Sequence, residues 1–149
     1  MNQRVETELV ENLYRPRRTC LSVPGSSAKM IQKAKQLPAD QVFLDLEDSV
    51  ASDAKAHART QVAASLAEGG WAGQLRGVRV NDWTTPWTHA DVIEVVATAG
   101  RDLDVVILPK VTDVSHVQAL DLLLTQLEVT HGLPVGRIGV EAQIRMPRD

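Results

Sequence analysis

The sequence is poor in cysteine and in aromatic residues. It has one cysteine, Cys20, and 3% aromatic residues among 149 residues. One cysteine cannot form an internal disulfide, so the sequence favours a reducing compartment, and we expect a cytoplasmic location. Because aromatic rings are scarce, aliphatic side chains must fill the core.

Long apolar runs and an excess of positive charge are lacking too. No stretch approaches the roughly 20 apolar residues of a membrane span, so no membrane association is expected. The formal net charge of −3 argues against nucleic acid as a partner. Residues 1–16 form a polar leader without the apolar core of a signal peptide, and we expect one domain over residues 17–149.

What the sequence does contain is a regular alternation of short apolar runs and segments of helical period. The predicted strands are residues 19–23, 41–47, 77–81, 104–110 and 136–144. The predicted helices are residues 28–37, 53–68, 87–100 and 113–132. Ser26 or Ser27, Asp53 and Asp113 are the expected helix N-caps.

This alternation predicts an α/β fold with a parallel sheet covered by helices. Two architectures fit, an open doubly wound sheet and a (β/α)8 barrel of the TIM type. The glycine fingerprint of a dinucleotide-binding sheet is missing after the first strand, where "VPGSSAK" stands, so the open sheet is disfavoured. A barrel needs about eight βα units, and this chain supplies about four and a half, so the predicted barrel is incomplete.

Strand alternation assigns each residue to one face of the sheet. The apolar faces carry Val42, Leu44, Leu46, Val78 and Val80, and the opposite faces carry Asp45, Glu47, Arg79, Asn81, Glu141 and Gln143. If the apolar faces pack on helices, Asp45, Glu47 and Arg79 meet at the carboxyl ends of the strands, where parallel α/β folds place their sites. Such a group suits an anionic substrate or a hydrated cation. The same residues would also serve as turn residues, helix caps and a structural ion pair.

Several motifs together resemble the HpcH/HpaI aldolase and citrate lyase beta-subunit family. They are "RRTCLSVPGSS", "FLDLEDSVASDAKAHAR", "VRVND", "VVILPK" and "IGVEAQI", and "VRVNDWTTPWTHADV" is most similar to the malyl-CoA lyase branch. The resemblance implies a (β/α)8 barrel and an Mg²⁺-dependent carbon–carbon lyase. Its substrate would be a 3-hydroxyacyl-CoA thioester of the malyl-CoA, citramalyl-CoA or citryl type, cleaved to an acyl thioester and a 2-oxo acid. It also implies a homo-oligomer for the intact enzyme.

The resemblance further implies roles for single residues. Arg79 matches the arginine that grips the substrate, and Lys33 matches a lysine that meets the phosphates of CoA. Asp45, Glu47 and Asp48 match acidic residues that support the Mg²⁺ ion through its water molecules.

The end of the sequence departs from the family pattern. Where the family has a glutamate that binds Mg²⁺ directly, this chain has Arg145, so no metal site is expected to be intact. The residues Arg145-Met146-Pro147 fit a one-base shift of codons for Glu-Asp-Ala, and we expect a frameshifted or truncated, inactive form. The alternative is a non-catalytic remnant that binds CoA or associates with an intact paralogue.

Overall fold

The structure, a computed structural model, describes residues 15–146. Its strands are β1 (Cys20–Pro24), β2 (Gln41–Asp45), β3 (Leu75–Arg79), β4 (Val105–Val111) and β5 (Gly139–Ile144). Its helices are α2 (Ala28–Ala34), the short 3-10 helix η1 (Ser52–Ala54), α3 (Lys55–Ala67), α4 (Thr88–Ala99) and α5 (Val114–Thr130). The predicted leader lies outside the described residues except for Arg15 and Pro16.

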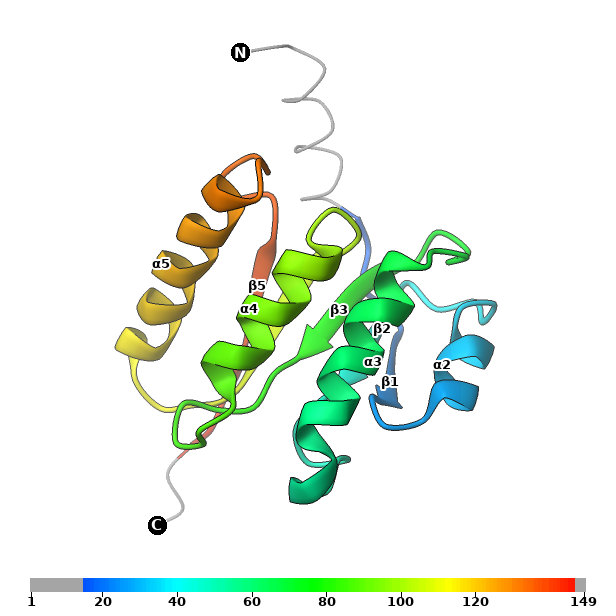
Figure 1. Cartoon of the computed structure of the whole chain (residues 1–149), viewed down its shortest axis with the longest axis horizontal. Helices are drawn as coiled ribbons and strands as arrows, with labels where there is room; N and C mark the ends of the chain where they lie inside the picture. The colour runs from blue at the N-terminus through cyan, green and yellow to red at the C-terminus, as the bar shows by residue number, and fades with distance from the viewer. Residues whose placement is uncertain (1–14, 147–149) are drawn as a thin grey trace.

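The five strands form one parallel sheet in the order β1-β2-β3-β4-β5, and the helices α2 to α5 cover the same side of it (Figure 1). A doubly wound sheet would reverse its strand order and carry helices on both sides. Sequential order with one-sided cover is the pattern of a (β/α)8 barrel. The prediction of an incomplete barrel-type fold is therefore confirmed for the described residues.

The core lies between the sheet and the helices and is almost wholly aliphatic. Its buried members from the strands are Val23, Val42, Leu44, Val78, Val106 and Leu108, joined by Leu46 and Val80 just past β2 and β3. Helix residues such as Ile31, Val62 and Leu120 pack against them. None of the described helices has the length and the apolar character that a bilayer crossing requires.

Two of the predicted helix caps are confirmed and one is wrong. The Ser27 hydroxyl accepts a hydrogen bond from the backbone N–H of Met30, and the Asp113 side chain accepts one from Ser115. Asp53 caps nothing, because the chain first makes the 3-10 turn η1 and the Ala54 N–H donates to the Ala51 carbonyl at 3.0 Å. Neither η1 nor α3 has a side-chain cap hydrogen bond at its start among the described residues.

Candidate functional site

The last residues of β2 and β3 form a two-point ion pair at the carboxyl edge of the sheet. Asp45 and Arg79 are directly opposite in the parallel register. Arg79 Nε donates to Asp45 Oδ1 at 2.8 Å, and Arg79 Nη2 donates to Oδ2 at 2.9 Å. Glu47 Oε2 lies 3.5 Å from Arg79 Nε. The structure thus brings together the three side chains that strand alternation placed on one face.

The carboxylate of Asp45 also organises the turn that follows β2. It accepts hydrogen bonds from the backbone N–H groups of Glu47 at 2.9 Å and Ser49 at 3.1 Å, and it is fully buried. Burial acts to raise the pKa of Asp45, but the hydrogen bonds from Arg79, Ser49 and Glu47 outweigh it and lower the pKa to about 2. The same pair raises the pKa of Arg79. Asp45 is therefore ionised at neutral pH and holds Arg79 in a fixed orientation.

The polar face of β5 points into the same interior as Arg79. Gln143 Oε1 lies 3.4 Å from Arg79 Nη1. Nearer the amino end of β5, Glu141 accepts a hydrogen bond from the Gln41 side chain at 3.2 Å and forms an ion pair with Arg17. The predicted face of β5 is therefore correct within the described residues.

A lysine that sequence reasoning missed lies among the remaining carboxylates. Lys110 Nζ is 2.6 Å from Glu47 Oε1, 3.2 Å from Asp48 Oδ1 and 3.9 Å from Asp82 Oδ2. The Glu47 carboxylate beside it raises the pKa of Lys110. We call Glu47, Asp48 and Asp82 the carboxylate cluster. Lys110 belongs to the quoted motif "VVILPK" at the end of β4, so its place beside the ends of β2 and β3 could have indicated it.

A second missed lysine supports this edge from the helix side. Lys55, at the start of α3, is buried and donates to the carbonyl oxygens of Leu46 at 2.7 Å and Glu47 at 2.5 Å. Its ammonium also lies over the ring of Trp87, 5.4 Å from the centroid. Burial lowers the pKa of Lys55. Lys55 thus holds the backbone that presents Glu47 and Asp48.

The placement predicted for Asn81 is wrong. Strand β3 ends at Arg79, so alternation no longer applies two residues later. Asn81 turns to the helix side, where its backbone and side-chain N–H groups donate to Asp91 Oδ2 on α4 at 3.0 and 2.7 Å. Asp91 is fully buried and also accepts from Arg59 Nε at 2.8 Å. Asn81 is therefore part of a structural network and not of the candidate site.

The structure places Lys33 away from Arg79 and the carboxylate cluster. Its exposed side chain is in the last turn of α2, and that helix runs back from the carboxyl edge toward the amino ends of the strands. Ser27, the last residue of the quoted motif "RRTCLSVPGSS", is the N-cap of α2. The geometry gives Lys33 no contact with Arg79 or the carboxylate cluster.

The described residues do not fit a directly bound magnesium ion. They contain no group of three or more His, Cys, Asp or Glu side chains arranged to hold a metal. Asp45 is engaged by Arg79, and Glu47 and Asp48 are engaged by Lys110. Arg145 follows β5, and its backbone N–H donates to the Val111 carbonyl, so a further cation stands beside the end of β4.

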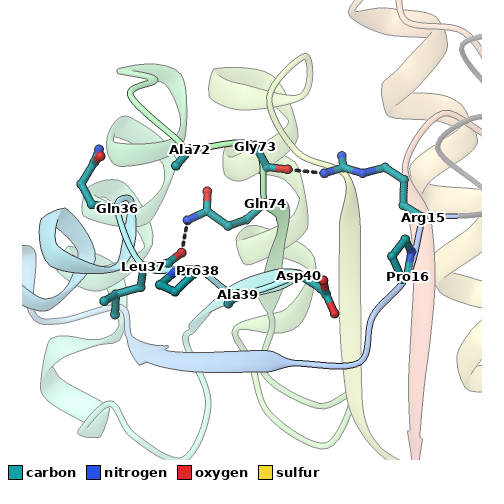
Figure 2. Close-up of a pocket in the computed structure, with 10 residues that line it drawn as sticks. All are labelled: Arg15, Pro16, Gln36, Leu37, Pro38, Ala39, Asp40, Ala72, Gly73 and Gln74. Carbon is teal, nitrogen blue, oxygen red and sulfur yellow. Dashed lines mark hydrogen bonds between the residues drawn. The ribbon is translucent and has the colours of Figure 1, made fainter.

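A cavity of about 320 Å³ lies at the opposite edge of the sheet. It is bounded by the segments that precede β1, β2 and β3, as Figure 2 shows. Arg15 reaches across it to the carbonyl of Gly73, and Gln74 donates to the carbonyl of Leu37 at 2.9 Å (Figure 2). It contains none of the predicted site residues, so this cavity is not the place where the charged groups converge.

Comparison with known proteins identifies the relatives of this chain. The family model described as HpcH/HpaI aldolase/citrate lyase matches residues 18–146. An L-malyl-CoA/beta-methylmalyl-CoA lyase of Cereibacter sphaeroides is 39% identical over 118 residues, covering 79% of this chain and 37% of the relative. A (3S)-malyl-CoA thioesterase of the same organism is 41% identical over 105 residues, covering 70% of this chain and 36% of the thioesterase.

Solved structures agree on the fold. The magnesium and glyoxylate complex of the malate synthase of Haloferax volcanii superposes with a TM-score of 0.75 at 20% identity, covering 84% of this chain and 41% of that one. The chain spans just over a third of the length of the curated relatives it matches.

Proposed function

The chain belongs to the HpcH/HpaI aldolase/citrate lyase family, and on that premise we propose that residues 17–149 are the N-terminal portion of a barrel domain of the CoA-ester lyase type. The reaction proposed for that domain is carbon–carbon cleavage of a 3-hydroxyacyl-CoA thioester. Malyl-CoA is the preferred candidate, because the malyl-CoA lyase and the malyl-CoA thioesterase share it by name.

The observation that carries this proposal is the way Asp45 presents Arg79. Two guanidinium nitrogens of Arg79 are fixed by Asp45, and within residues 15–146 the third, Nη1, has only the 3.4 Å contact with Gln143. The Arg79 side chain is 19% exposed at the carboxyl edge. A guanidinium held in this way offers a fixed positive charge to a carboxylate or to a developing oxyanion without reorganisation.

The reaction needs such a charge. When the bond between C2 and C3 of malyl-CoA breaks, its electron pair moves toward the thioester carbonyl and gives the enolate of acetyl-CoA. The C3 hydroxyl loses its proton and becomes the carbonyl of glyoxylate. Arg79 is suited to bind the carboxylate of the oxo acid or to stabilise the enolate oxygen.

Magnesium dependence and the identity of the acyl group are predictions. The name of the malate synthase structure includes magnesium, and the family resemblance implies it, but the described residues supply no set of direct ligands. No catalytic step is therefore assigned to a metal here. Homo-oligomerisation and a cytoplasmic location likewise stay predictions from the resemblance and the cysteine content.

The second candidate is a non-catalytic protein that binds a CoA ester or associates with an intact paralogue. The observation that favours it is the cationic character of the ends of β4 and β5, where Lys110 and Arg145 stand. Under this hypothesis the 149-residue chain binds malyl-CoA without cleaving it. The proposed role of Lys33 at the CoA phosphates applies to either candidate.

One assay distinguishes the candidates. Purified chain is incubated with malyl-CoA and Mg²⁺, and glyoxylate and free CoA thiol are measured separately, with the thiol of Cys20 subtracted. Cleavage releases glyoxylate and leaves the thioester intact, hydrolysis releases thiol without glyoxylate, and a binder releases neither. Glyoxylate release that disappears in Arg79→Met, while circular dichroism shows that the variant is folded, supports the lyase.

Binding is then measured by calorimetry, with Arg145→Glu tested in parallel as the restored family residue. Saturable binding of malyl-CoA without products supports the second candidate. Absence of both products and of binding, in a chain shown to be folded, would refute both.

A further inference from the structure

The carboxylate cluster already contains a cation of its own. Lys110 Nζ is within 4 Å of Glu47 and Asp48, which follow β2, and of Asp82, which follows β3. Glu47 is 4% exposed, and its Oε1 has no well-aligned hydrogen bond among the described residues, so the ammonium at 2.6 Å neutralises it by proximity. Without that ammonium the buried carboxylate would lack compensation on this side.

The backbone of β4 is distorted where Lys110 enters. Lys110 has a φ of 53°, and among the described residues every other positive φ belongs to a glycine. The β4–β5 ladder pairs Leu108 with Ala142 and then Val111 with Ile144, so three steps on β4 match two on β5. This is a bulge with one extra residue, which redirects a side chain at a cost of about 1–3 kcal/mol for a left-handed residue that is not glycine. The distortion therefore lies at the residue whose ammonium contacts the cluster.

Two other cations beside the cluster, Lys55 and Arg79, cannot easily leave. Lys55 is 7% exposed and is bound to two carbonyl oxygens, and the Arg79 side chain is 19% exposed and is fixed by Asp45 at two points. The Lys110 side chain is 37% exposed on a flexible stem. A divalent ion entering the cluster would therefore have to displace Lys110.

We propose that Lys110 is a tethered cation that occupies the carboxylate cluster in place of a hydrated divalent cation, and so excludes divalent metal ions from it. Lysine is suited to this, because its ammonium is a compact positive charge with three hydrogen-bond donors. It can therefore contact several carboxylates at once, as a small hydrated cation does. The inference concerns charge occupancy at this edge, and it is an alternative to the water-mediated support of Mg²⁺ that the family resemblance implies for Glu47 and Asp48.

The test measures Mn²⁺ binding by electron paramagnetic resonance, with no substrate present. The wild type is compared with Lys110→Met and Lys110→Gly, which both remove the ammonium. Lys29→Met, at an exposed lysine of α2, is the matched control. We expect both Lys110 variants to bind Mn²⁺ about tenfold or more tightly than the wild type and the control. Adding Asp82→Asn to Lys110→Gly should remove most of that gain.

Lys110→Gly keeps the test decisive if the loss of charge prevents Lys110→Met from folding, because glycine adopts a positive φ without strain. If either variant is unfolded, circular dichroism with Mn²⁺ gives the answer, since recovery of helical signal supports the proposal and lack of recovery opposes it. Mn²⁺ binding by the wild type as tight as by the variants, or a gain that survives Asp82→Asn, would overturn the proposal.

Discussion

Arg79 and Asp45 face each other across β3 and β2 and meet through two hydrogen bonds of 2.8 and 2.9 Å. This relationship follows from three features of the sequence taken together. Successive side chains of each strand point to opposite faces of the sheet, and the strands are parallel. The register pairs the last residue of β2 with the last residue of β3. The Asp45 carboxylate that holds the turn after β2 also orients the guanidinium of Arg79.

Removing the arginine should strongly destabilise the fold. Arg79→Met leaves the fully buried Asp45 carboxylate without its main partner, so we expect the free energy of unfolding to fall by about 3–5 kcal/mol. Urea unfolding of the 149-residue chain measures this, with Arg101→Met, at an exposed position, as the control. The loss should shrink in the double variant with Asp45→Asn, and equal losses in both backgrounds would show that the pair is not coupled.

Stability should fall in acid through Asp45. Its pKa is about 2 in the folded chain against an ordinary 3.8, so the folded state favours the ionised form. A lowered pKa contributes stability above the unfolded value and loses it as the pH falls through the folded value, here about 2 kcal/mol lost between about pH 4 and pH 2. Urea unfolding at several pH values should show this slope in the wild type and a shallower slope in Asp45→Asn. Identical slopes would argue against Asp45 as the source.

Gly25 should not tolerate even a methyl group. Its N–H donates to the Asp45 carbonyl at 2.8 Å, and an added Cβ would lie 2.7 Å from that same oxygen and 2.8 Å from Val62. Gly25→Ala is therefore expected to cost about 1–3 kcal/mol of stability and to disturb the turn that holds Asp45. Gly139→Ala is the control, because its Cβ would stay 3.6 Å from the nearest atom. Similar unfolding midpoints for the two variants would contradict the close approach.

The sequence predicts the fold and the convergence of Asp45, Glu47 and Arg79 because these depend on repeating features. Period-two alternation, apolar strands and intervening helices determine which face is polar and which edge collects the strand ends. Single-sequence reasoning fails where a local irregularity decides the outcome. The placement of Asn81 was wrong because β3 ended two residues before it.

Lys110 and Lys55 were missed for similar reasons. Lys110 acts on the carboxylate cluster through a bulge that no periodic pattern indicates. Lys55 would count as an ordinary charged residue of a helix, and only the tight turn of η1 shows why its ammonium is directed inward to two carbonyl oxygens. Among the residues that meet at this edge, the sequence prediction included Asp45, Glu47, Asp48 and Arg79, and it missed Asp82 and both lysines.

Glu128 on α5 holds the segment that leads into β5, and its removal tests how firmly β5 is positioned. Its buried carboxylate on α5 accepts hydrogen bonds from the backbone N–H groups of Gly136 and Ile138, both at 2.8 Å. Glu128→Ala leaves two N–H groups without this acceptor, so we expect a loss of about 2–4 kcal/mol and faster hydrogen exchange at those two amides. Asp121→Ala, exposed on the same helix, controls for lost charge and altered helix propensity. Because β5 carries Gln143 to Arg79, a loosened β5 should also weaken malyl-CoA binding, and unchanged amide exchange in Glu128→Ala would refute this route.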